Sequence, residues 1–437
     1  MEKKLKLAKQ YGLKKDDLMQ MLRNVYLSRR LDDTEISMKK QSKAFFQISG
    51  AGHEGVLTAL ARAMKPKYDY FVPYYRDRAL CLGLGVTPYE MLCQANGNIG
   101  DKASHGRQMP AHWGHSDLNI VSKSSCTGTQ FLQAVGVAEA GRYLSQLTEE
   151  GVEHGLPSHK NEIVLATCGD GTTSQGEFWE ALTTSCVNKL PVMFLVEDNG
   201  YAISVPVGVQ TPGGSISKAL NEFPELKIYE VNGNCPIESY AASVEAVKYL
   251  RSGKGPVLFH AHVTRPYSHS LSDDQKMYRT NEELEIESKK DVFNSFPKLL
   301  VESGMISESE KDQLYIEVDE SLKKALKECL ETPWPKPEDS LKHVFSEDVD
   351  ISSSDFDNEG EASGKDDIPM AGAINKVLRE EFSKDPLLRL FGEDVADFSE
   401  LEKYETDLKG KGGVFKVTSG VQKVSRKNQV FNSPLAE

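Results

Sequence analysis

The chain has 437 residues, of which 39% are hydrophobic and 27% charged, which is ordinary for a globular protein with more than one domain. A formal net charge of -13 argues against generic binding to nucleic acid or to an anionic membrane, and no apolar run reaches spanning length. The first residues lack an apolar core and arginine, so neither a secretory signal nor a transit peptide is expected. Seven cysteines without metal or redox spacing favour a cytoplasmic location.

The N-terminal third of the chain is predicted to alternate helices with polar loops. Apolar residues at helical spacing predict a first helix over 16–33. His53 follows a Gly-rich turn; it could face the site, but a packing or surface role is expected. Arg76 could hold phosphate oxygens or pair with the adjacent Asp77, and the residues alone leave both open. His112 lies in a polar loop over 106–114, where a surface histidine is the simplest interpretation.

The stretch 161–206 contains the most informative pattern in the sequence. Apolar runs over 163–167 and 192–196 predict two strands buried on both faces. Phe178, Leu182 and Cys186 recur every four residues and predict a helix between them, with cap hydroxyls at 172–174. A strand, a helix and a strand of these lengths predict one crossover of a parallel sheet.

Polar residues stand directly after each of these two strands. Asp170 follows the first strand and Asn199 the second, at the edge where open α/β sheets bind ligands. Asp170, Asn199 and the Tyr201 carbonyl could supply the oxygen ligands of a magnesium ion. Gly169 and Gly171 would let a phosphate approach the backbone. Each motif alone is more simply a loop turn, but together they favour a metal–diphosphate site.

The rest of the chain divides into a further α/β portion, an acidic linker and a C-terminal segment. Residues 257–263 predict a buried strand, followed by a loop in which Arg265, His269 and hydroxyls are suited to an anionic substrate and proton movement. A helical pattern covers 282–330. Residues 343–366 are acidic and Ser- and Gly-containing, which is typical of a linker. A helix from Met370 and a strand over 387–391 are predicted after it.

The Gly-Asp-Gly motif, followed about thirty residues later by Asn-Gly-Tyr-Ala-Ile-Ser, resembles the alpha subunit of the decarboxylating component of 2-oxo acid dehydrogenase complexes. The resemblance covers roughly the first four-fifths of the chain. It implies a doubly wound, mostly parallel α/β fold that binds thiamine diphosphate and Mg²⁺. Asp170, Asn199 and Tyr201 would be the magnesium ligands.

The resemblance also implies roles for the other motifs. His269 would be catalytic in acyl transfer, and His112 would lie near the substrate. The cofactor would contact a set of residues spread over the chain: Tyr75, Arg76, Ser125, Gly169, Asp170, Gly171, Asn199, Tyr201, Arg265 and His269. Branched-chain members have a potassium site, matched here by Ser124, Thr129 and Gln130. Cys126 and Thr127 replace the usual Pro-Leu beside it, which leaves K⁺ an open possibility.

The loop 106–114 matches the branched-chain type of this family, so 3-methyl-2-oxobutanoate is the expected substrate. The implied activity is that of an oxidoreductase that decarboxylates the 2-oxo acid and passes the acyl group to the lipoyl arm of an acyltransferase partner. Pyruvate or acetoin as substrate, another class of thiamine enzyme, and a non-catalytic cofactor-binding fragment are the alternatives. A homo-oligomer is expected.

The segment after Met370 resembles the start of the beta subunit of the same enzyme. We therefore expect an alpha-like domain over 1–342, a linker over 343–366, and an incomplete pyrimidine-type α/β domain over 367–437. Glu437 matches the beta-subunit glutamate that contacts the aminopyrimidine ring. The expectation is that this chain needs a further beta-subunit portion, in cis or in trans, for activity.

Overall fold

The structure is a computed structural model that describes residues 2–346, 348–356, 367–399 and 409–436. The chain forms two compact units, one of residues 1–145 and 157–335, the other of residues 146–156 and 336–437. No helix among the described residues combines the length and the apolar character that a bilayer span requires. The predicted Glu437 lies outside the described residues.

The first unit is built on a five-stranded sheet in the order β1-β2-β3-β7-β6, with every neighbouring pair parallel. Its strands are β1 Tyr70–Val72, β2 Val164–Gly169, β3 Val192–Asp198, β6 Lys227–Asn232 and β7 Val257–His262, and a short hairpin joins β4 Tyr201–Ala202 to β5 Val205–Pro206. Its helices are α1 Glu2–Gln10, α2 Lys15–Lys40, α3 Glu54–Ala63, α4 Arg78–Leu84, α5 Pro88–Asn96, α6 Thr129–Glu149 (which ends in the second unit), α7 Gly176–Asn188, α8 Val207–Gln210, α9 Ile216–Ala219, α10 Pro236–Arg251, α11 Asn281–Lys290, α12 Val292–Glu302 and α13 Glu308–Glu331. The predicted α/β class with a parallel sheet is confirmed.

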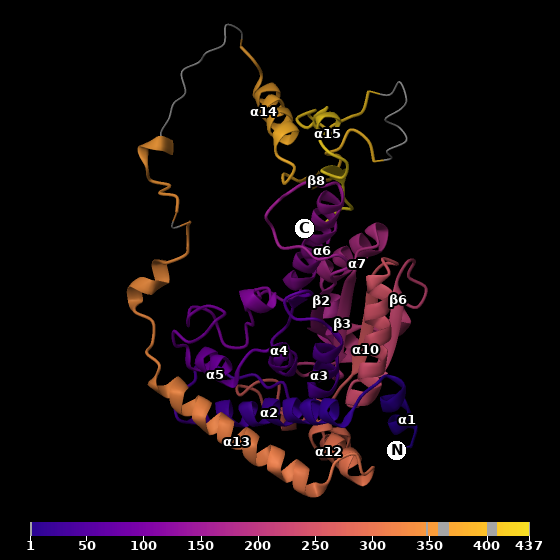
Figure 1. Cartoon of the computed structure of the whole chain (residues 1–437), viewed down its shortest axis with the longest axis vertical. Coiled ribbons are helices and arrows are strands. Elements are labelled where there is room, and N and C mark those ends of the chain that lie inside the picture. Colours follow the sequence, from indigo (N-terminus) through magenta and orange to yellow (C-terminus); the bar gives the residue numbers. More distant parts are fainter. Residues whose placement is uncertain (1, 347, 357–366, 400–408, 437) are drawn as a thin grey trace. The chain divides into compact units, whose positions relative to one another are not determined.

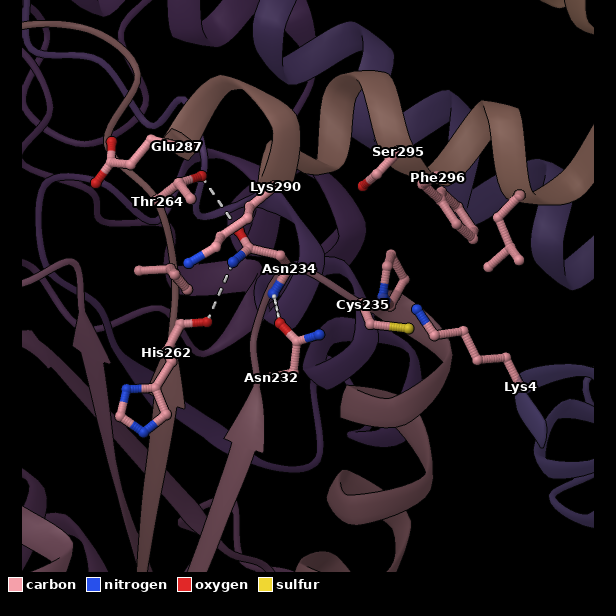
Figure 2. Close-up of a pocket in the computed structure, with 13 residues that line it drawn as sticks. Lys4, Asn232, Asn234, Cys235, His262, Thr264, Glu287, Lys290, Ser295 and Phe296 are labelled. Carbon is pink, nitrogen blue, oxygen red and sulfur yellow. Dashed lines mark hydrogen bonds between the residues drawn. The ribbon is translucent and has the colours of Figure 1, made fainter. Parts of the chain in front are cut away.

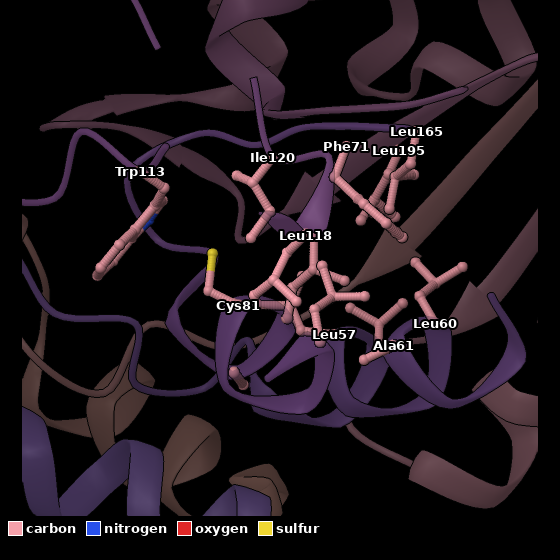
Figure 3. Close-up of a cluster of buried hydrophobic side chains, with 14 of the residues drawn as sticks. Leu57, Leu60, Ala61, Phe71, Cys81, Trp113, Leu118, Ile120, Leu165 and Leu195 are labelled. Carbon is pink, nitrogen blue, oxygen red and sulfur yellow. The ribbon is translucent and has the colours of Figure 1, made fainter. Parts of the chain in front are cut away.

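Both faces of the sheet are covered, which is why its central strands are apolar throughout. Every residue of β3 is buried. Met193 and Leu195 pack into a core shared with α3, α4 and α10, part of which Figure 3 shows. Phe194 points to the opposite face, where it joins Phe131 of α6 and Phe178 of α7. This alternation follows from the two-residue period of a strand. It lets one strand pack against helices on both faces of the sheet.

The crossover predicted over 161–206 is present, with one difference at its turn. β2 and β3 are adjacent parallel partners joined through α7, whose buried face includes the predicted stripe at Phe178, Leu182 and Cys186. The hydroxyls at 172–174 do not cap α7, because a 3-10 turn (η2, Asp170–Ser174) separates them from it. Within that turn the Thr173 hydroxyl donates to the Asp170 carbonyl oxygen (2.8 Å). The tight turn therefore shapes the loop after β2.

Helices at the N- and C-terminal ends of this unit also pack on each other (Figure 1). Tyr26 of α2 stacks on Tyr315 of α13 with 3.7 Å between ring centroids, although the two lie far apart in sequence. The predicted helix over 16–33 is confirmed as the longer α2. The helical pattern over 282–330 corresponds to three helices, α11 to α13.

The second unit contains α14 Met370–Lys384, β8 Leu390–Gly392, α15 Val421–Val424 and β9 Val430–Asn432, with β8 parallel to β9. Phe382, Ala396, Val421 and Val430 form its small core. Polar side chains hold its segments together: Asn375 donates to the carbonyl oxygens of Val417 and Ser419, and Asn432 accepts from the Ala396 N–H. The helix predicted from Met370 is confirmed.

Candidate cofactor site

The candidate site lies at the carboxyl edge of the sheet, where β2 and β3 end. Asp170 begins η2 directly after β2, and Asn199 follows β3 before the β4–β5 hairpin. The two loops touch, since a Cβ placed on Gly171 would lie 2.5 Å from the Cβ of Ala202. A side chain at position 171 would therefore displace the hairpin that carries Tyr201. This contact places the turn that carries Asp170 beside the hairpin that carries Tyr201.

Asp170 is a buried carboxylate with an unused oxygen. It is 3% exposed, and its Oδ2 has no hydrogen-bond partner among the described residues. Burial, followed by the charge of Asp198, raises the pKa of Asp170 from 3.8 to about 7. The backbone N–H groups of Asp170 and Asn199 act in the opposite direction. A cation beside Oδ2 would stabilise the ionised form.

Asn199 contacts a buried histidine, His53, for which the sequence favoured a packing or surface role. His53 is fully buried, with its Nδ1 2.7 Å from Oε2 of Glu197 and its Nε2 3.4 Å from Nδ2 of Asn199. The surface role considered for His53 is therefore wrong, the packing role is confirmed, and the histidine links Glu197 to Asn199. Burial and the neighbouring Arg76 lower the pKa of His53 well below its ordinary value. A neutral His53 accepts from the Asn199 amide N–H group, and Asn199 Oδ1 accepts from the Tyr201 N–H (3.3 Å).

Two buried guanidinium groups face the same region. Arg265 is 1% exposed and donates through Nη2 to the Tyr278 hydroxyl (2.8 Å), whereas its Nε and Nη1 have no partner within the described ranges. Burial, and then the charge of Arg76, lower the pKa of Arg265. Its guanidinium carbon lies 5.8 Å from the centroid of the Tyr201 ring. A buried cationic group without a partner is unfavourable, so these free N–H groups are suited to bind an anion.

Arg76 contacts His269 and not its sequence neighbour Asp77. Its Nη1 donates to the Ser49 carbonyl oxygen (2.5 Å), and its Nη2 lies 3.1 Å from both Nδ1 and the carbonyl oxygen of His269. The ion pair with Asp77 that the sequence left open is therefore not formed. Asp77 instead accepts from the Tyr74 N–H (3.0 Å) and the Thr167 hydroxyl.

His269 is a neutral histidine fixed on both sides. Burial, followed by Arg76 and Arg265, lowers the pKa of His269 to about 4. Its backbone N–H donates to Asp273 Oδ2 (2.9 Å), and its ring meets the Tyr75 ring edge-on with 6.0 Å between centroids. Because Arg76 donates to Nδ1, the remaining ring proton belongs on Nε2. His269 can therefore donate a hydrogen bond from Nε2 near neutral pH.

The predicted residues His112 and Ser125 meet each other. The Ser125 hydroxyl lies 2.8 Å from His112 Nε2, and His112 Nδ1 lies 3.2 Å from the Pro110 carbonyl oxygen. The loop that carries His112 is fastened to the site through Trp113, whose indole N–H donates to the Tyr75 carbonyl oxygen (3.3 Å). Burial lowers the pKa of His112.

The three predicted potassium ligands are each engaged separately. Ser124 Oγ accepts from the Cys126 N–H (3.3 Å), Thr129 donates to the Cys126 carbonyl oxygen (3.1 Å), and Gln130 donates to the Thr167 carbonyl oxygen (3.0 Å). Gln130 Oε1 is buried and has no partner in the part of the chain that the structure describes. Potassium binding stays a prediction.

A family model described as "Dehydrogenase E1 component" matches residues 22–338. The chain belongs to the dehydrogenase E1 component family. It is 33% identical over 335 residues to the 2-oxoisovalerate dehydrogenase subunit alpha of Bacillus subtilis (strain 168), covering 77% of this chain and 97% of that protein. The pyruvate dehydrogenase E1 component subunit alpha of the same organism is 29% identical over 331 residues, covering 76% and 82%. The 2-oxoisovalerate dehydrogenase subunit alpha 2, mitochondrial, of Arabidopsis thaliana is 28% identical over 328 residues, covering 75% and 65%.

As an E1 alpha component, the chain is an oxidoreductase of a 2-oxo acid dehydrogenase complex, with E1 beta and E2 partners. The family implies thiamine diphosphate and Mg²⁺ as cofactors. The residues of this E1 chain fit that pair. Asp170 Oδ2 and the Arg265 Nε and Nη1 atoms have no hydrogen-bond partner in the part of the chain described, and a magnesium diphosphate would offer partners to both residues.

A separate pocket of about 560 Å³ opens beside β6 and β7 (Figure 2). Lys4, Asn234 and Lys290 are among its lining residues. The predicted cofactor residues are not among those that line it.

Two features of the E1 site were not predicted from the sequence: the contacts of His53 with Glu197 and Asn199, and the hydrogen bond between Arg265 and Tyr278. The acidic Glu197 at the end of an apolar run was the available signal for the first.

Proposed function

We propose that this E1 alpha chain acts on a branched-chain 2-oxo acid, 3-methyl-2-oxobutanoate, and delivers the acyl group to the lipoyl arm of its acyltransferase partner. When bound, thiamine diphosphate supplies the nucleophilic carbon that makes decarboxylation of a 2-oxo acid feasible. One observation carries the cofactor assignment: a buried carboxylate oxygen of Asp170 and two buried guanidinium nitrogens of Arg265 have no hydrogen-bond partner among the described residues, and the two charged groups lie near each other.

The binding roles follow from this complementarity. Asp170, Asn199 and the Tyr201 carbonyl would hold Mg²⁺, with Gly169 and Gly171 allowing close approach of the diphosphate. Arg265 would donate to the diphosphate through its free Nε and Nη1. Tyr75, Arg76 and Ser125 would complete the cofactor contacts. Because the site is buried, these contacts act with little screening by water.

The two loop histidines, His112 and His269, would handle the substrate and the acyl group. His269 is kept neutral by Arg76 and Arg265, so its Nε2–H is available as a hydrogen-bond donor to a reacting oxygen. His112, which lies in the loop 106–114 and is joined to Ser125, would contact the 2-oxo acid. The higher identity to the 2-oxoisovalerate relative supports the branched-chain assignment, and the pyruvate relative at 29% supports pyruvate as the second candidate.

A substrate comparison tests this proposal. The chain is assayed by dye reduction with an E1 beta chain and saturating thiamine diphosphate and Mg²⁺, using 3-methyl-2-oxobutanoate, pyruvate and acetoin. A higher kcat/KM for 3-methyl-2-oxobutanoate is expected. A higher value for pyruvate would assign the chain to the second candidate.

Residues 367–437 are proposed to correspond to the opening of an E1 beta subunit, with 343–366 as the linker. Its support is the order of helix, Gly-Glu-Asp-Val and Gly-Gly-Val-Phe-Lys-Val-Thr, and the bonds by which Asn375 and Asn432 join these segments. Glu437 would supply the acid to the aminopyrimidine ring. A homo-oligomer, and K⁺ bound by Ser124, Thr129 and Gln130, belong to the same proposal.

A further inference from the structure

Three side chains with metal-ligating atoms meet beside the cofactor site, on residues that have no role in the proposed function. Asp198 ends β3, and His260 and His262 lie two residues apart on β7, so the two histidines share one face of the strand. Asp198 is the register partner of His262 across the parallel pair. One ligand atom from each of the three residues lies within 4.8 Å of the others.

Hydrogen bonds on the far side of each imidazole decide which nitrogen faces Asp198. The Ser217 hydroxyl donates to Glu230 Oε2 (2.8 Å), so its oxygen is left to accept from His260 Nδ1 (2.9 Å). His262 Nε2 lies 2.8 Å from Glu230 Oε1, and a carboxylate can only accept from it. Each histidine thus places its N–H on an outer partner.

The inner nitrogens therefore present lone pairs to a carboxylate. His260 Nε2 lies 2.9 Å and His262 Nδ1 3.7 Å from the same oxygen, Asp198 Oδ2. A lone pair facing a carboxylate oxygen at this distance repels it unless a cation stands between them. The cation is either a proton, which would make His260 a fully buried imidazolium, or a metal ion.

The hydrogen bonds around the two histidines match those of histidines that bind a metal ion. Histidines that bind metals donate their other N–H to a carboxylate, carbonyl or water, which sets the tautomer, and Glu230 serves both histidines here, directly for His262 and through Ser217 for His260. We propose that Asp198, His260 and His262 form a three-ligand site for a divalent transition metal such as Zn²⁺. The His262 side chain is 48% exposed, which leaves a fourth position open to water.

This site is distinct from the magnesium site and borders it. Imidazole favours zinc and related ions, whereas the oxygen donors around Asp170 favour magnesium. Figure 2 shows the His262 ring turned away from the neighbouring pocket, where its backbone carbonyl accepts from Asn234 (3.5 Å). The other oxygen of Asp198 accepts from the Gly200 N–H (2.9 Å). A metal on Oδ2 would therefore restrain the loop that begins at Asn199.

The test is a metal titration of the full chain, stripped with a chelator and kept in excess Mg²⁺ without thiamine diphosphate. Co²⁺ should give the visible absorption of a tetrahedral N/O site at one equivalent, and Zn²⁺ should displace it. His262→Ala, at a half-exposed position, should abolish the bands while the circular dichroism is unchanged. Glu230→Gln, which changes the outer partner, should weaken Zn²⁺ binding roughly 10–100-fold.

Two control variants make the result specific. His105→Asn removes an exposed histidine outside the cluster, at a left-handed backbone position that asparagine tolerates, and should bind as the wild type does. Asp170→Asn should also retain the Co²⁺ bands, which separates this site from the proposed magnesium site. Wild-type chain that gives no Co²⁺ bands, or His262→Ala chain with unchanged bands, would overturn the proposal and leave a proton between His260 and Asp198.

Discussion

Replacing Asp170 by asparagine should stabilise the metal-free chain while it destroys the magnesium site. The pKa of this carboxyl is 3.8 when exposed and about 7 in the fold, mainly because burial disfavours the charge. The folded chain thus binds the proton more tightly than the unfolded chain does. Folding loses stability as the pH rises from about 4 to about 7, and the loss is constant above that range.

The size of the effect follows from the shift. About three pKa units at about 1.4 kcal/mol each give roughly 4 kcal/mol of lost stability near pH 8. Near pH 5 the folded carboxyl is neutral, and the loss is about 2 kcal/mol. Asparagine carries no charge, so the difference between wild type and variant should grow by about 2–3 kcal/mol between these pH values.

Thermal melts of both chains at the two pH values, without metal, measure this difference. The Tm advantage of Asp170→Asn should be several degrees larger near pH 8 than near pH 5. With Mg²⁺ and thiamine diphosphate the order should reverse, because the wild type alone gains the bound cofactor. The matched control is Asp117→Asn, at an exposed aspartate, which should show neither effect. A Tm difference that does not change with pH would refute the assigned burial cost, and unchanged cofactor affinity would refute the metal assignment.

Three further predictions concern the rest of the site. Arg265→Gln should weaken thiamine diphosphate binding roughly 10–100-fold by calorimetry, since a charged hydrogen bond contributes about 1.5–3 kcal/mol; unchanged affinity would contradict the anion role. Gly171→Ala should weaken the same binding because its Cβ meets Ala202 at 2.5 Å, and adding Ala202→Gly should restore it, whereas a loss without rescue would point to another cause. His269→Gln should reduce acyl transfer to a lipoyl acceptor. Its pKa of about 4 keeps His269 neutral from about pH 5 to 8, so cofactor affinity should follow the same pH dependence in both chains.

The local pattern of apolar residues was sufficient to predict the central strands of the sheet. The run after Ile163 and the run from Val192 are apolar because both faces of the sheet are covered, and this property is visible without coordinates. Parallel neighbours end at the same edge, so placing Asp170 and Asn199 after their strands already placed them close together. The capping prediction at 172–174 failed because α7 begins only at Gly176, after the η2 turn. The Thr173 hydroxyl bonds within that turn, and the Ser174 hydroxyl donates to the Gln210 carbonyl oxygen (2.9 Å).

Contacts between distant segments could not be predicted from the sequence. In the sheet β7 lies beside β3, and this strand order brings His260 and His262 to Asp198. The sequence of a strand does not specify which other strand pairs with it, so this cluster could not be predicted. The same holds for His53, whose place under Asn199 depends on how α3 packs. Sequence determined which groups stand at the ends of strands, since periodicity and turn chemistry are local. Tertiary structure decided which of those groups are buried, paired or left without a partner, because burial and long-range hydrogen bonds arise only when the layers pack.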